Sequence, residues 1–146
     1  MSVLTYSMAQ MLILEQGENI VIPDTYTSID AYSFSGKEIS SIFIPDSVTS
    51  IGDFAFSGNN LTSLDLPESV VSIGSGAFNY NQLTSIEIPD SVTSIGAYAF
   101  SENQLTSVEI SDNITSIEES AFSFNQLKRV DILSLIHISE PTRQIR

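Results

Sequence analysis

A 22-residue repeat dominates this sequence. The stretch 83–104, LTSIEIPDSVTSIGAYAFSENQ, aligns without gaps with 61–82 and 105–126, and the period extends back through 39–60 and, more loosely, through 17–38. It continues forward for six residues, 127–132. A fixed period of this size indicates stacked supersecondary units that bury their apolar sides against one another. We therefore predict one solenoid domain over 17–132, with no room for a second domain.

The first part of each repeat, counted with Ile39 as position one, predicts a short strand. Positions four and six are aliphatic in every unit, and position five varies between them: Val21, Phe43, Asp65, Glu87, Glu109 and Asp131. This in–out–in alternation is typical of a half-buried strand. Position seven is proline in four units, and proline ends a strand because it lacks the N–H that the ladder needs.

The second part of each repeat, V-T-S-I-G-x-x-A-F, predicts a corner. Gly52, Gly74 and Gly96 are expected to adopt a positive φ there, followed by one tight helical turn near each Ala-Phe. The phenylalanine column is expected to give the largest single contribution to the core: Phe34, Phe56, Phe78, Phe100 and Phe122. An asparagine column is expected to bond the backbone of adjacent coils as a ladder: Asn59, Asn81, Asn103 and Asn125.

The pattern L-x-x-I-x-I-P-x-x-V-x-x-I-G-x-x-A-F-x-x-N resembles the leucine-rich repeat of bacterial surface proteins of the BspA type, the treponemal class. The resemblance covers 17–132 and implies a β-rich, right-handed leucine-rich-repeat superhelix of 22-residue coils with short parallel strands. It also implies a binding face that is displayed outside the cell. The sequence departs from the family in having asparagine where a cysteine is usual, and in a period one residue shorter than is common. The resemblance supplies no catalytic residues.

Charge and composition exclude several functions. The formal net charge is −13, and 17–132 holds sixteen acidic residues against Lys37, Lys128 and Arg129. Such a surface repels nucleic acid and anionic membranes, so we expect no nucleic-acid partner, no membrane insertion and a monomer. Without cysteine the chain has no disulfide framework and no thiolate metal site.

The two ends of the chain fit no repeat. Residues 1–16 contain no basic residue and a short apolar run, so no signal peptide is visible, and we expect a strand that caps the first coil or a fragment of a preceding coil. Residues 133–143, LSLIHISEPTR, closely resemble the translation of a transposase-type sequencing adapter. We interpret 133–146 as a non-native tail and exclude it from functional reasoning.

The residues that catalysis needs are scarce. His137, the one histidine, lies in that tail, and no phosphate loop, H-E-x-x-H motif or nucleophile elbow occurs. The carboxylates at position five recur from coil to coil, which favours a solvated surface over an active site. We therefore predict that the chain is not an enzyme and needs no cofactor. Asp65, Glu87, Glu109 and Asp131 stay open as weak calcium candidates, because oxygen arrays bind Ca²⁺.

Exposed residues that break the pattern are the candidates for specificity, because the fold does not require them. Phe43 replaces an acid at position five, Tyr80 and Phe124 stand at position twenty, and Tyr98 stands at position sixteen. We predict a module of the cell surface or extracellular space that binds a protein or a glycan, as in adhesion. A structural spacer within a longer surface array is the alternative, and regular threonine columns leave a remote ice-binding or cation-binding solenoid open.

Overall fold

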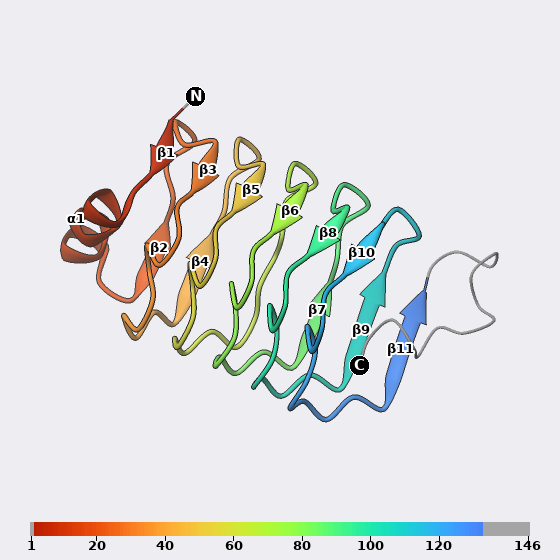
Figure 1. Ribbon diagram of the computed structural model, residues 1–146. Coiled ribbons are helices and arrows are strands. Elements are labelled where there is room, and N and C mark those ends of the chain that lie inside the picture. The colour runs from red at the N-terminus through yellow and green to blue at the C-terminus, as the bar shows by residue number, and fades with distance from the viewer. Residues whose placement is uncertain (1, 133–146) are drawn as a thin grey trace.

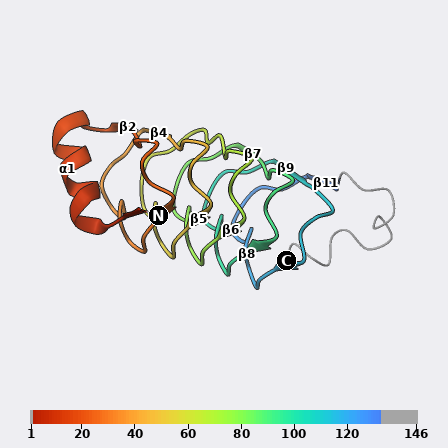
Figure 2. The ribbon, with the colours of Figure 1, turned by 90° about the horizontal axis from the view of Figure 1, so that it is seen from above.

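The computed structural model describes residues 2–132, with side chains up to residue 128. Its coils stack along one axis as a solenoid, and α1 lies at the N-terminal end of the stack (Figures 1 and 2). Every strand pair is parallel, and successive coils pair one repeat apart, as Ser50 does with Ser72. The predicted solenoid of 22-residue coils with short parallel strands is confirmed.

One face of the solenoid is a six-stranded sheet in the order β1-β3-β5-β6-β8-β10. Each of its strands is two residues long: β1 Val3–Leu4, β3 Ser28–Ile29, β5 Ser50–Ile51, β6 Ser72–Ile73, β8 Ser94–Ile95 and β10 Ser116–Ile117. From β3 onward the serine lies on the outer side, and the isoleucine is buried in all of these coils except the last, where it is half-buried.

The opposite face is divided into two sheets. β2 (Asn19–Val21) pairs with β4 (Ser41–Phe43), and β7 (Ser85–Glu87) pairs with β9 (Ser107–Ile110), which pairs with β11 (Arg129–Ile132). No strand forms between them at 61–66 in this described region. Leu64 and Leu66 occupy the positions where the other coils carry isoleucine or valine, and leucine lacks the branched Cβ that favours a strand.

The core is built from repeat columns, as predicted. The five phenylalanine rings at position eighteen are buried and stack nearly parallel, with centroids 5.2–5.5 Å apart. This spacing lies within the range of favourable aromatic pairs. Leu61, Leu83 and Leu105 at position one are fully buried beside them. Each coil therefore completes the apolar surface of its neighbours.

The asparagine ladder is also confirmed. Nδ2 of Asn81 donates to the backbone carbonyls of Phe56, Phe78 and Asn79 at 2.9, 3.1 and 3.2 Å. Its Oδ1 accepts from the backbone N–H of Leu61 at 3.1 Å. Asn59, Asn103 and Asn125 repeat the arrangement. The Leu61 N–H and the phenylalanine carbonyls find their partners in this ladder, and each asparagine joins its own coil to the preceding one.

The prediction of a positive φ at Gly52, Gly74 and Gly96 is wrong. Glycine is needed there for space, because a Cβ on Gly52 would lie 2.7 Å from the backbone N of Ala31 in the preceding coil. The predicted helical turn is replaced by turns with i→i+3 hydrogen bonds, such as Ala55 N–H to the Gly52 carbonyl at 3.2 Å. The coils approach one another closely along this row, and side chains are excluded from it.

The N-terminal segment differs from the expected strand. β1 pairs with β3 over only two residues, and the chain then enters helix α1, Tyr6–Gln16. Thr5 caps the helix by accepting the N–H of Met8 on its side-chain oxygen at 3.4 Å. Ala9 and Leu12 are buried, and Ile13 packs against the core. Within 2–132 no helix is long and apolar enough to cross a bilayer. The tail 133–146, which includes the adapter-like stretch 133–143, lies outside the described residues.

Candidate functional site

The turn segment of each coil holds two residues in the left-handed backbone region. At position sixteen these are Tyr32, Phe54, Gly76, Tyr98 and Ser120, with φ between 57° and 62°. At position twenty they are Gly36, Gly58, Tyr80, Glu102 and Phe124, with φ between 54° and 66°. The fold therefore fixes the backbone at both positions in every coil. Glycine adopts this conformation without strain, whereas a bulky side chain does not.

Four aromatic side chains at these positions are exposed to solvent, and one of them, Tyr32, stacks on Phe54. The exposed fraction is 59% for Tyr80, 45% for Tyr98 and 72% for Phe124. We call these three residues the aromatic edge. Each combines a strained backbone with a large apolar side chain in water, and neither condition helps the chain to fold.

Phe54 differs from the aromatic edge because its ring is used in packing. A Cβ on Gly76 would overlap the Phe54 ring, so this ring covers the glycine of the next coil. Tyr32 stacks on its other side at 5.2 Å between centroids, with 13° between the planes. Gly76 is thus needed both for its positive φ and for the space above it.

Phe43 lies away from the aromatic edge. It is 58% exposed on the outer side of β4, where it pairs in register with the exposed Val21 of β2. The four residues predicted to bind a partner are therefore all exposed. Tyr80, Tyr98 and Phe124 lie in the turn segments of successive coils, whereas Phe43 lies on a strand.

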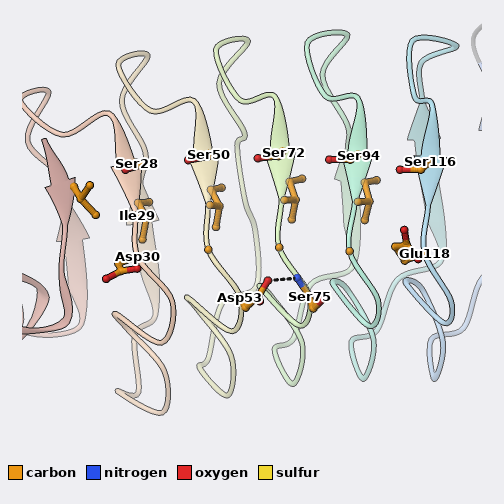
Figure 3. Close-up of a pocket in the computed structure, with 17 residues that line it drawn as sticks. Ser28, Ile29, Asp30, Ser50, Asp53, Ser72, Ser75, Ser94, Ser116 and Glu118 are labelled. Atoms are coloured by element: carbon orange, nitrogen blue, oxygen red, sulfur yellow. Dashed lines mark hydrogen bonds between the residues drawn. The ribbon is translucent and has the colours of Figure 1, made fainter. Parts of the chain in front are cut away.

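A groove of about 600 Å³ crosses the six-stranded sheet. Gly52, Gly74 and Gly96 line its middle, and Asp30 and Glu118 stand at its two ends (Figure 3). Five serines line one side of it: Ser28, Ser50, Ser72, Ser94 and Ser116. The groove follows from the missing side chains at position fourteen.

Threonine hydroxyls at the repeated threonine positions donate hydrogen bonds to the backbone of the solenoid. The hydroxyls of Thr49, Thr93 and Thr115 donate to the carbonyl of the residue one coil earlier, at 3.2, 3.4 and 3.0 Å. Val71 interrupts this column and is exposed. Hydroxyls that already donate to the backbone have less capacity to order water or to bind sugar, which disfavours the ice-binding alternative.

The acidic column at position five is continuous only in the C-terminal part of the solenoid. Glu87 pairs in register with Glu109, and Glu109 pairs with Asp131. Asp65 lies outside any strand and beside a small pocket of about 180 Å³ that Glu68 and Glu87 also line. Among the described side chains no group of three or more acidic or histidine residues is arranged to hold a metal ion. Calcium binding by the column stays a prediction.

Sequence reasoning selected the residues of the aromatic edge by their irregularity but missed their backbone conformation. The signal was present at position twenty, where the first two coils carry Gly36 and Gly58 and the next three carry Tyr80, Glu102 and Phe124. Glycine at a repeated position can mark a positive φ, and at position twenty all copies share it, including those in which another residue has replaced glycine. The serine-lined groove was also missed, because glycine was interpreted as a corner.

A family model for the BspA type leucine rich repeat region matches residues 15–128 in six copies. The chain belongs to this family. The match covers all but the last four residues of the repeat region 17–132 that the sequence indicated. The BspA-type repeat accordingly accounts for the strands, the phenylalanine column and the asparagine ladder described above.

Solved structures of similar shape include a bacterial cell surface protein and a vaccine antigen. A leucine-rich cell surface protein from Faecalibacterium prausnitzii A2-165 matches with a TM-score of 0.77 and 28% identity, covering 88% of this chain and 34% of that one. The pneumococcal vaccine antigen PcpA matches with a TM-score of 0.71 and 25% identity, covering 79% of this chain and 30% of that one. The chain thus spans about a third of the length of each. No curated protein matches it.

Proposed function

We propose that this BspA-type solenoid is a non-catalytic recognition module of the bacterial cell surface that binds a protein or a glycan through its aromatic edge. The observation that carries the proposal is the pairing of strain with exposure at Tyr80, Tyr98 and Phe124. Strained backbone persists at binding sites because it is retained for function, and exposed aromatic side chains dominate recognition surfaces. The surface location is supported by the similarity to a cell surface protein of Faecalibacterium prausnitzii and to a pneumococcal antigen.

The edge has the form of an elongated recognition surface. Positions sixteen and twenty recur along the stack at the strand spacing of about 4.8 Å, so their side chains form lines parallel to the solenoid axis. A linear partner, such as an extended peptide or a glycan chain, would follow these lines. Rigid aromatic rings lose little conformational entropy when a partner covers them, which favours binding by a preformed surface.

The test is selection against two libraries, a glycan array and a phage-displayed peptide library, with the immobilised chain. We expect specific enrichment that is lost in the triple variant Tyr80→Gly, Tyr98→Gly, Phe124→Gly. Phe43→Ser removes an equally exposed aromatic from the opposite face and is the matched control, which should retain the enrichment. Equal enrichment with the wild type and the triple variant, or no enrichment at all, would favour the spacer alternative.

A further inference from the structure

Position twenty changes its character along the solenoid. Its residue is Gly36 and Gly58 in the first two coils and Tyr80, Glu102 and Phe124 in the next three. All five share a left-handed backbone, with φ of 65°, 66°, 54°, 56° and 55°. The first two coils show that glycine satisfies the fold at this position. The three larger residues stand in consecutive coils, and the backbone conformation does not require a side chain at this position.

The three residues are also in register. The N–H of Tyr80 donates to the carbonyl of Ser101, and the N–H of Glu102 donates to the carbonyl of Ser123, each at 3.1 Å. The same backbone conformation in consecutive coils directs the three Cβ atoms alike. The order along the axis is therefore aromatic, carboxylate, aromatic, and we call these residues the triplet.

The dimensions of the triplet fit a cation. Tyr80 and Phe124 are two coils apart, or about 10 Å at the spacing of neighbouring strands. A positive charge placed midway, over Glu102, would lie about 5 Å from each ring, inside the distance at which a cation is attracted to an aromatic face. The carboxylate of Glu102 would then supply a charge-assisted hydrogen bond. A neutral sugar can stack on the rings and donate a hydroxyl to Glu102, but it gains neither the cation–π attraction nor the ion pair, and an apolar side chain leaves Glu102 without a partner.

The chain shows the same interaction within its own fold. Nζ of Lys37 lies 5.2 Å from the centroid of the Tyr6 ring and donates to the Tyr6 hydroxyl at 3.2 Å. No lysine or arginine occurs between Lys37 and Lys128, so the three coils that carry Tyr80, Glu102 and Phe124 hold no cationic side chain of their own. With a net charge of −13, the whole molecule attracts a basic partner toward its surface.

We propose that the triplet Tyr80, Glu102 and Phe124 binds a lysine or arginine side chain of a partner polypeptide. The inference rests on the proposed function, because it names the partner of part of the aromatic edge. It selects a basic protein segment over a glycan. The specificity comes from Glu102, which separates a cationic side chain from other groups that stack on aromatic rings.

The test uses two blocked peptides of the sequence Gly-Ser-Gly-X-Gly-Ser-Gly, in which X is arginine or its neutral isostere citrulline. Binding to the ¹⁵N-labelled chain is followed by chemical-shift titration. We expect the arginine peptide to shift the amides around positions 80, 102 and 124, and to bind at least about fivefold more tightly than the citrulline peptide. Glu102→Gln should weaken the arginine peptide by a similar factor.

Glu109→Gln is the matched control. It removes the same charge from an exposed glutamate of β9 on the opposite face and should leave the titration unchanged. Equal weakening by Glu109→Gln and Glu102→Gln, equal binding of the two peptides, or no localised shifts would each overturn the inference. A glycan from the array that needs Tyr80 and Phe124 but not Glu102 would also overturn it, while leaving the proposed function intact.

Discussion

Phe78→Ala is expected to lower the free energy of unfolding by about 3–5 kcal/mol. The ring is fully buried in the middle of the phenylalanine column, with centroids 5.2 Å from Phe56 and 5.5 Å from Phe100. Its removal leaves a cavity between two rings that are fixed by their own coils. Urea denaturation followed by circular dichroism measures the loss.

Thr84→Ala is the control for this change. Thr84 is exposed at position two, next to the strand of the same coil, and its substitution is expected to change the free energy of unfolding by less than about 0.5 kcal/mol. If the two variants lost similar stability, the columns would have been assigned to the wrong faces of the solenoid.

Asn81→Asp is expected to cost about 3–5 kcal/mol, although the two side chains have nearly the same shape. The substitution replaces Nδ2 with an oxygen that faces the backbone carbonyls of Phe56, Phe78 and Asn79. Each of the three carbonyls loses one of its two donors, and the buried carboxylate faces these carbonyls with only the Leu61 N–H as its partner. The free energy of unfolding at pH 7 measures the effect without any change in packing volume.

Asn60→Asp provides the comparison for the ladder. Asn60 directly follows the ladder residue Asn59 in the sequence and is exposed to solvent. Asn60→Asp therefore adds the same charge as Asn81→Asp, but adds it in water. We expect a change below about 0.5 kcal/mol. A similar loss in both variants would mean that added negative charge, and not the asparagine ladder, determines the result.

Most of the fold was predictable because the repeat supplies several independent observations of each position. Six aliphatic residues at position four define an inward face more firmly than any single strand could, and the phenylalanine and asparagine columns gain from the same repetition. The parallel pairing follows directly, because identical units that stack in order place identical residues side by side.

The differences between the predicted fold and the structure have identifiable physical causes. Glycine can mark either a positive φ or a close approach of two backbones, and the sequence alone does not distinguish Gly52 from Gly58. The strand at 61–66 is lost through leucine at two positions, a change that keeps the hydrophobic pattern intact. The sequence of helix α1 contains a threonine cap and a run of strong helix formers, both of which indicate a helix. A strand was predicted there instead, because a strand was expected to cap the first coil.

The candidate site was predictable in its residues and not in its backbone. Tyr80, Tyr98 and Phe124 stand out as exposed irregularities in a regular sequence. Their left-handed conformation becomes visible only when the turn is built, because tyrosine and phenylalanine carry no local preference for it. Phe54 has the same conformation, and its ring packs against Gly76, so the conformation identifies a binding candidate only where the side chain is also exposed and unpacked.

The free energy of unfolding of Tyr80→Gly, Tyr98→Gly and Phe124→Gly tests most directly whether the aromatic edge exists for binding. Glycine relieves a left-handed strain of about 1–2 kcal/mol and costs roughly 0.5–1 kcal/mol in unfolded-chain entropy, so each variant should be as stable as the wild type or up to about 1 kcal/mol more stable. Phe54→Gly, whose ring covers Gly76, should instead lose stability. A loss above about 1 kcal/mol in each of the three edge variants would show that these rings serve the fold, and would contradict the account.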